Sequence, residues 1–282
     1  MTYTTLISTE ALAEHLNDPA WVIVDCRFTL SDTEAGRRAY AAGHLPGARY
    51  AHLDEDLSGP RDGRNGRHPL PDPAVFAQTL GRWGIDRDKQ VVVYDDSFGS
   101  MAVRLWWMLR WMGHDAVALL DGGLPKWQRE HRPLTSEVPV VRPTVFVPSL
   151  REDMRVDAQA VLEASRTGGR LILDARPEMR FTGEMEPIDP VAGHVPGAVN
   201  VPFDDNLDLG GTFLPPGELR AHYEALLAGR RPDQVILMCG SGVTACHDLL
   251  AMEVAGLGGA KLYPGSWSEW IADPARPVAT GE

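Results

Sequence analysis

The sequence predicts an α/β protein made of two tandem copies of one domain, each a mainly parallel sheet flanked by helices. The chain of 282 residues is long for one hydrophobic core but comfortable for two. Several segments of the first half return about 150 residues later, a spacing too long for a solenoid repeat. Short apolar runs alternate with helical patterns, as is typical of parallel strands covered on both faces.

The internal repeat defines the predicted domains. Four segments recur: 21–27 as 170–176, 42–48 as 192–198, 91–95 as 235–239 and, more weakly, 121–127 as 264–270. We therefore expect an N-terminal domain at 1–131, a linker at 132–149 and a C-terminal domain at 150–282. The linker is expected to be semi-rigid, because it is rich in proline and lacks helical periodicity.

Each copy reads as helix, strand, Gly/Pro-rich loop, helix, buried strand, helix and strand. The clearest buried strands are 91–94, 117–120, 171–173 and 235–238. The segment 101–112 carries three tryptophans in an apolar helical pattern, which predicts a buried helix. A further helical pattern begins at about Ala245.

The most informative stretch follows the last of these strands. Cys239 stands at the carboxyl end of strand 235–238, where open parallel sheets place their ligands. The Gly-rich turn 240–244 then leads into a helix, so its amides can converge on the cysteine, favour a thiolate and hold a persulfide. The alternative is that Cys239 has no catalytic role and is a small, buried and unreactive thiol. The matching position of the first copy is Asp95, so that copy is predicted to be non-catalytic.

Composition excludes several functional classes. The formal net charge of −12 argues against nucleic acid or an anionic membrane as the main partner. Three cysteines are too few for a disulfide framework and have no zinc-ligand spacing, and no nucleotide-binding glycine motif is present. Without a signal peptide or a long apolar run, we expect a cytoplasmic protein that uses no metal and no cofactor. Cys26 and Cys246 are expected to be packed in the interior.

The duplicated domain, the paired Gly-His-x-Pro-Gly-Ala turns and the Cys-x4-Thr loop resemble the tandem-domain rhodanese family, over roughly residues 5–275. The loop Cys-Gly-Ser-Gly-Val-Thr is most similar to the 3-mercaptopyruvate sulfurtransferase branch. The thiosulfate branch usually has Arg and Lys where this chain has Gly240 and Ser241. The resemblance implies that a sulfane sulfur moves from 3-mercaptopyruvate or thiosulfate, through a Cys239 persulfide, to cyanide, a thiol or thioredoxin in a ping-pong scheme.

The resemblance also implies a donor site around the cysteine. Arg180 matches the arginine with which the family holds the anionic donor, and its forked guanidinium suits a carboxylate or thiosulfate oxygens. The active loop supplies the remaining donor-binding residues: Gly240, Gly242, Val243 and Thr244. The mercaptopyruvate branch commonly has a second donor-binding arginine, but here that position falls near Pro187. Its absence weakens mercaptopyruvate as a donor and leaves a thiosulfate preference open.

Three further residues match a proton relay of the mercaptopyruvate enzymes. Ser241 is expected beside the substrate, with His68 and Asp54 behind it, because a mercaptan donor must lose its S–H proton. His68 could instead only cap backbone groups of its loop. His44 and His194 occur in the turns of both copies and are therefore expected to be structural.

Two functions from other classes remain open. Arsenate reductases and phosphatases of this fold tend to have a loop one residue longer that ends on arginine, whereas this loop ends on Thr244. A non-enzymatic persulfide carrier or regulatory module would also fit a reactive Cys239, although it has less need of Arg180. A steady-state assay with a small acceptor distinguishes the enzyme from the carrier.

Overall fold

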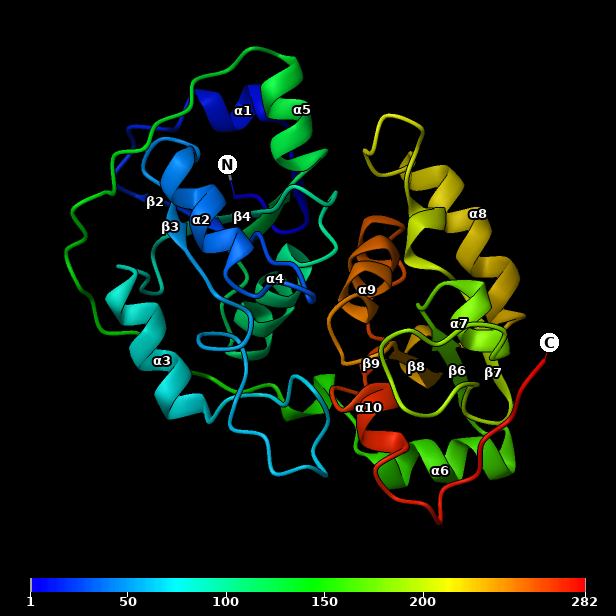
Figure 1. The fold of residues 1–282 in the computed structure, drawn as a ribbon. Helices are drawn as coiled ribbons and strands as arrows, with labels where there is room; N and C mark the ends of the chain where they lie inside the picture. Colours follow the sequence, from blue (N-terminus) through cyan, green and yellow to red (C-terminus); the bar gives the residue numbers. More distant parts are fainter. Residues whose placement is uncertain (1, 282) are drawn as a thin grey trace. The chain divides into compact units, whose positions relative to one another are not determined.

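The computed structural model describes residues 2–281 and forms two compact units (Figure 1). The first unit contains the chain up to Gly59, Leu70–Arg151 and Leu209–Thr212. The second contains Pro60–Pro69, Glu152–Asp208 and the chain from Phe213 onward. Both units are α/β with a parallel sheet, which confirms the predicted fold class. The sequence boundaries of the two domains stay a prediction.

The first unit has a five-stranded parallel sheet in the order β1-β5-β4-β2-β3. The strands are β1 (Leu6–Ile7), β2 (Trp21–Asp25), β3 (Arg49–Tyr50), β4 (Gln90–Tyr94) and β5 (Val117–Leu120). The central pair, β2 and β4, is in register from Trp21 with Gln90 to Asp25 with Tyr94. Every residue of β4 and β5 is buried, because helices cover both faces of the sheet.

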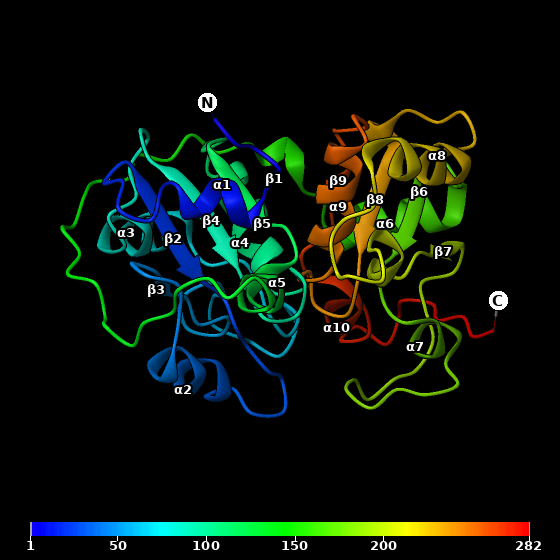
Figure 2. The same cartoon turned by 90° about the horizontal axis from the view of Figure 1, so that it is seen from above.

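Helices cover the first sheet on two sides (Figures 1 and 2). They are α1 (Thr9–Ala13), α2 (Ala35–Ala42), α3 (Pro73–Arg82), α4 (Ala102–Trp111) and α5 (Gly123–Arg129). Leu12 of α1, Tyr40 of α2 and Trp127 of α5 share one core cluster with alternate residues of the strands. The tryptophan-rich α4 packs against β4 and β5. Helix α3 begins where Pro73 follows Asp72, whose carboxylate caps two N–H groups.

The predicted linker 132–149 forms neither helix nor strand and packs along the first unit. Its Thr135 exchanges backbone hydrogen bonds with His44 (2.8 and 2.9 Å). The N–H of Thr144 donates to the carbonyl of Gly81, also at 2.9 Å. These bonds give the extended, proline-rich chain a backbone partner at several points along its length.

The second unit has a four-stranded parallel sheet in the order β7-β6-β8-β9. The strands are β6 (Leu171–Asp174), β7 (Ala198–Asn200), β8 (Val235–Met238) and β9 (Lys261–Leu262). The helices are α6 (Ala158–Thr167), α7 (Glu178–Thr182), α8 (Pro216–Leu227), α9 (Ala245–Val254) and α10 (Ser266–Trp270), with short 3₁₀ turns at Glu152–Met154, Phe203–Asn206 and Pro232–Gln234. Helices α6 and α10 share a core with β6 and β8, while α9 packs on β8 and β9 and α8 packs on α9 (Figure 2).

The duplication extends to individual hydrogen bonds in the repeated turns. His44 Nδ1 lies 2.8 Å from the carbonyl of Tyr40, and His194 Nδ1 lies 2.8 Å from the carbonyl of Phe181. Each imidazole also stacks on the ring of that same neighbour, at 3.9 and 3.8 Å between centroids. The two histidines therefore stabilise their loops, which agrees with the structural role predicted for a residue present in both copies.

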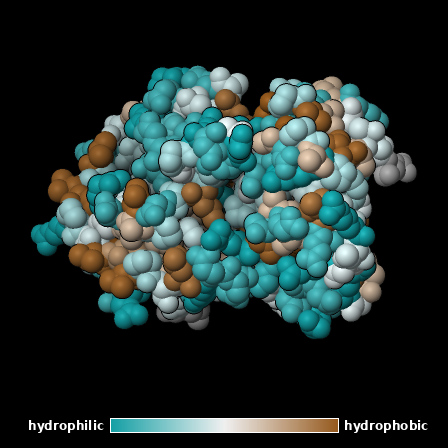
Figure 3. Space-filling view, turned by 90° about the horizontal axis from the view of Figure 1, so that it is seen from below, coloured by the Kyte–Doolittle hydropathy of each residue, from teal (hydrophilic) through white to brown (hydrophobic). Residues whose placement is uncertain are grey.

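No helix within residues 2–281 is long and apolar enough to cross a bilayer. The face drawn in Figure 3 is mainly hydrophilic, with small hydrophobic groups scattered across it.

Candidate active site

Cys239 follows β8 directly, and only 2% of its surface is exposed. Its N–H donates to Ser266 Oγ (3.1 Å), and its carbonyl accepts from the N–H of Trp267 (2.9 Å). The next carbonyl, of Gly240, accepts from the N–H of Ser268 (2.9 Å). The first turn of α10 thus holds the start of the active loop, which we define as residues 239–244.

The amides of the active loop are available to a bound anion. The N–H groups of Gly240, Ser241, Val243 and Thr244 have no acceptor within residues 2–281. None of them donates to Cys239 Sγ, so their predicted convergence on the cysteine side chain stays a prediction. Free N–H donors at the start of a helix suit an anion that extends beyond the sulfur, such as a persulfide or a donor oxygen.

The first unit shows what the equivalent turn can bind. Asp95, the counterpart of Cys239, accepts N–H groups from Ser97 (2.9 Å) and Gly99 (2.8 Å) on Oδ1, and from Met101 and Ala102 (both 2.8 Å) on Oδ2. Burial raises the pKa of Asp95, although these four N–H groups oppose the shift. The turn after this strand can therefore surround an acidic side chain with backbone donors.

Two of the three predicted relay residues meet in the second unit. His68 Nδ1 lies 2.8 Å from Ser241 Oγ, and both side chains are buried. Residues 60–69 belong to this unit and are anchored by the N–H of Arg67, which donates to Ser268 Oγ (2.9 Å). Asp54 lies in the first unit, where its N–H donates to His52 Nδ1 (3.2 Å). Its part in a relay stays a prediction.

Arg180 projects from α7 into a cluster of opposite charges. Its Nε donates to both carboxylate oxygens of Glu186 (3.0 Å each), and its Nη2 donates to Asp189 Oδ2 (2.9 Å). The other oxygen of Asp189 accepts from Arg67 Nη1 (2.6 Å). Burial would raise the pKa of Glu186, but the hydrogen bonds from Arg180 and from two backbone N–H groups lower it.

Both guanidinium groups face the residue after the cysteine. A Cβ built on Gly240 would lie 3.1 Å from Arg67 Nη2 and 3.4 Å from Arg180 Nη1. Arg180 is a sequence-predicted site residue, whereas Arg67 is one that sequence reasoning missed. Its only signal is that it immediately precedes His68, and a lone arginine carries no motif of its own.

A third arginine is buried near the cysteine. Arg176 Nη2 donates to Asp174 Oδ2 (2.7 Å) and to the carbonyl of Gly193 (2.8 Å). Burial would lower the pKa of Arg176, but the charge and hydrogen bond of Asp174, followed by the charges of Glu186 and Cys239, raise it. Cys239 therefore lies in the field of a cation that remains charged.

The model of the Rhodanese-like domain matches residues 8–130 and again 157–273. The chain belongs to the rhodanese family. The two matched segments coincide with the two copies of the repeat, and the second contains the active loop and Arg180.

Full-length relatives of this rhodanese carry sulfurtransferase names. A probable 3-mercaptopyruvate sulfurtransferase of Pseudomonas aeruginosa is 49% identical over 98% of both chains. A putative thiosulfate sulfurtransferase, SseB of Mycobacterium tuberculosis, is 43% identical over 92% of this chain and 90% of its own. The crystal structure of the 3-mercaptopyruvate sulfurtransferase SseA of Escherichia coli matches with a TM-score of 0.81 and 35% identity, over 95% of this chain and 100% of that chain. This rhodanese is a sulfurtransferase, with a small-molecule sulfur donor and acceptor.

Gly242→Ala should lower the stability of this rhodanese by about 1–3 kcal/mol or more. Gly242 has a φ of 73°, and an added Cβ would lie 2.2 Å from the carbonyl oxygen of Pro264. Urea unfolding measures the change. Gly217→Ala in α8 is the matched control, since its Cβ would meet nothing within 4 Å and its φ is not positive. Equal stability of the two variants would contradict the prediction.

The two other cysteines, Cys26 and Cys246, are packed in the interior, as the sequence predicts. Cys26 and Cys246 are 2% and 0% exposed. Burial raises the pKa of Cys26 well above its ordinary value, and the charges of three aspartates, Asp25 first, add to the shift. A thiol in this environment is a poor nucleophile.

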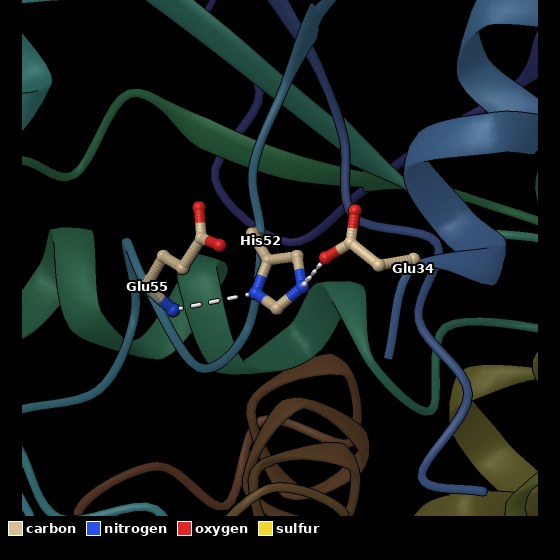
Figure 4. A group of neighbouring side chains, drawn as sticks. All are labelled: Glu34, His52 and Glu55. Atoms are coloured by element: carbon tan, nitrogen blue, oxygen red, sulfur yellow. Dashed lines mark hydrogen bonds and ion pairs between the residues drawn. The ribbon is translucent and has the colours of Figure 1, made fainter. Parts of the chain in front are cut away.

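Within the described residues, one cluster of possible metal ligands is found in the first unit. Glu34, His52 and Glu55 bring ligand atoms within 4.8 Å of one another (Figure 4). The imidazole is already engaged: Nδ1 accepts the N–H of Glu55 (3.3 Å), and Nε2 lies 3.0 Å from the carbonyl of Thr33. Arg37 pairs with both carboxylates (3.1 and 2.6 Å). Nε2 also lies 3.5 Å from Glu34 Oε1, so the cluster is a network of ion pairs and of hydrogen bonds to the backbone.

Proposed function

We propose that this sulfurtransferase takes its sulfur from 3-mercaptopyruvate, carries it as a persulfide on Cys239 and passes it to a thiophilic acceptor. The observation that carries the donor choice is the 2.8 Å contact between His68 Nδ1 and Ser241 Oγ, two residues after the cysteine. A hydroxyl paired with an imidazole can move a proton. Thiosulfate has no proton to move, whereas a mercaptan does.

The donor half-reaction follows from the groups around the active loop. The Cys239 thiolate attacks the sulfur of the donor, a new S–S bond forms, and the bond between that sulfur and C3 of mercaptopyruvate breaks. The electron pair remains on carbon as the enolate of pyruvate. The S–H proton passes to the Ser241–His68 pair and returns to C3, which completes pyruvate. Arg180 binds the donor carboxylate, since its charge and planar fork suit that group.

The active loop would stabilise the persulfide. Four N–H groups of the loop have no acceptor within the described chain, and the equivalent turn of the first unit binds Asp95 with four N–H groups. The terminal sulfur of a persulfide on Cys239 is an anion that could accept these donors. Acceptance by cyanide, a thiol or thioredoxin then regenerates the thiolate. With all three cysteines free, a reducing compartment such as the cytoplasm is the proposed setting.

Ser241→Ala should lower turnover of 3-mercaptopyruvate by roughly 10²- to 10⁴-fold, the usual contribution of a positioned acid or base. Turnover of thiosulfate should change little, because no thiol proton is lost. The measurement is kcat/KM for both donors with one acceptor, and thiosulfate is the control for folding of the variant. A higher kcat/KM for thiosulfate in the wild type, or equal damage to both donors, would reject the mercaptopyruvate preference and the proton role together.

A further inference from the structure

We propose that the first unit contains a ligand site of its own, which binds a small organic phosphate monoester. The site is a cavity of about 520 Å³, a volume within the range of small-molecule sites. It lies at the amino edge of the first sheet, because Trp21 begins β2 and Lys89 immediately precedes β4. Asp95, the counterpart of the nucleophile, follows the carboxyl end of β4. The cavity is therefore separate from that turn, and ligand binding there does not depend on the sulfur donor.

Three segments of the first unit line the cavity: the loop after α1, the chain at the starts of β2 and β3, and the linker where it runs past α3 (Figures 1 and 2). Lys89 Nζ donates to the carbonyl of Pro19 (2.9 Å), which joins the loop after α1 to the chain before β4. Thr144 Oγ1 donates to the carbonyl of Ile85 (2.8 Å), which fastens the linker. The walls of the cavity are thus held by hydrogen bonds, so a ligand would not have to order them.

Arg49 supplies a half-buried cation to the cavity. Its Nε donates to the carbonyl of Trp83 (3.1 Å), and its Nη1 donates to the carbonyl of Gly47 (2.7 Å). These bonds fix the guanidinium, while Nη2 makes no hydrogen bond and the group forms no ion pair within residues 2–281. Burial lowers the pKa of Arg49, and the charge of Tyr40 opposes the shift. A fixed, partly buried cation without a carboxylate partner is suited to an anionic ligand.

The other charges of the cavity are positive, with one exception. Lys89 and Arg142 line it together with Arg49, and the side chain of Arg142 makes no hydrogen bond or ion pair within the described chain. Asp18 is the one carboxylate among the lining residues; its Oδ1 accepts a backbone N–H (2.9 Å), and its Oδ2 lies 3.6 Å from His15 Nδ1. Three cations and one carboxylate leave an excess of positive charge that suits a dianion, in a protein whose net charge is −12. Guanidinium and ammonium groups are the side chains that bind phosphate oxygens.

Val140 indicates that the ligand carries a carbon skeleton. This linker residue is 97% exposed, and it lines the cavity together with Leu16 and Trp21. A bare phosphate ion would leave this apolar surface in water, whereas an organic group attached to the phosphate would cover it. A phosphate monoester supplies both parts: a dianion for the three cations, and carbon atoms for the apolar side chains.

The test measures the binding of ribose 5-phosphate to the full chain by isothermal titration calorimetry, with ribose, inorganic phosphate and succinate as comparison ligands. Arg49→Met and Arg142→Met each remove one cation of the cavity. Arg87→Met is the matched control, since it removes an exposed cation from the chain just before β4 that does not line the cavity. The guanidinium of Arg142 makes no hydrogen bond within residues 2–281, so its removal should leave the fold intact even if Arg49→Met is unstable.

Two further variants separate the parts of the site. Val140→Ser removes the exposed apolar side chain, and Val145→Ser is its control, because Val145 is 81% exposed in the same linker but does not line the cavity. Arg180→Met removes the cation predicted to bind the sulfur donor, so it distinguishes binding in the cavity from binding at the active loop.

We expect ribose 5-phosphate to bind the wild type with a Kd below about 1 mM, and at least about tenfold more tightly than inorganic phosphate or succinate. Ribose should not bind. Arg49→Met and Arg142→Met should each raise the Kd roughly 10- to 100-fold, the effect of one lost charged hydrogen bond. Val140→Ser should raise it roughly 3- to 10-fold for the ester and leave inorganic phosphate unchanged. Arg87→Met, Val145→Ser and Arg180→Met should stay within about twofold of wild type.

Absence of binding by ribose 5-phosphate would overturn the proposal. Equal affinity of Arg142→Met and Arg87→Met would overturn it as well, because the cation of the cavity would then contribute nothing. A loss of binding in Arg180→Met as large as that in Arg142→Met would place the ligand at the active loop instead. Inorganic phosphate or succinate bound as tightly as the ester would reject the phosphate monoester as the ligand class.

Discussion

Cys239→Ser is expected to abolish sulfur transfer with every donor. A serine hydroxyl cannot form a persulfide, and it is a far weaker nucleophile than a thiolate at neutral pH. Incubation of the wild type with a sulfur donor should raise its intact mass by one sulfur atom, whereas the variant should gain none. Its turnover should fall to the background of the assay, while its fold is retained because serine is only slightly smaller than cysteine.

The two other thiols provide the controls for this prediction. Cys26→Ser and Cys246→Ser should each gain the sulfur atom and retain turnover, because both residues are packed in the interior. A sulfur adduct that persisted in Cys239→Ser would show that another residue carries the sulfur. Loss of the adduct in Cys26→Ser alone would lead to the same conclusion.

Arg176→Met is expected to lower the stability of the second unit by about 3–5 kcal/mol, because it leaves the buried Asp174 carboxylate without its cation. The side chains of this pair are 1% and 0% exposed, so solvent cannot compensate the charge. The guanidinium also lies over the ring of Trp267, at 4.6 Å from the centroid. Urea unfolding measures the loss of stability.

The first unit contains the matched pair for this experiment. Arg27 donates to Asp25 (2.6 Å) and to the carbonyl of Gly43 (2.8 Å), as Arg176 does to Asp174 and Gly193. Arg27→Met should destabilise its own unit by a similar amount but leave Cys239 loading unchanged in the folded protein. Arg176→Met should also slow loading, because a cation near the cysteine is lost. A stability change below about 1 kcal/mol in both variants would contradict the reading of these pairs as buried ion pairs.

The sequence alone determined the fold class and identified Cys239 as the candidate nucleophile. Apolar runs such as 235–238 mark strands that are buried on both faces, because no polar residue could be accommodated there. The glycines after Cys239 mark a tight turn, and the repeat identifies Asp95 as its counterpart. These features are local or periodic, so they can be read without knowing which segments meet. Arg180, Ser241 and His68 could be named from the resemblance to the family, but their contacts could not be derived from spacing.

Only the tertiary structure decided what surrounds the cysteine. His68 reaches Ser241 across 173 residues of sequence, and Arg67 reaches Asp189 across 122. Near Pro187 the sequence lacks the second arginine that the mercaptopyruvate branch commonly has. In the structure, the nearby Asp189 binds Arg67, which comes from a distant segment of the chain. The linker 132–149 likewise packs along the first unit through backbone bonds that its composition does not encode. Such contacts depend on how loops far apart in the chain pack together, and neither periodicity nor local propensity carries that information.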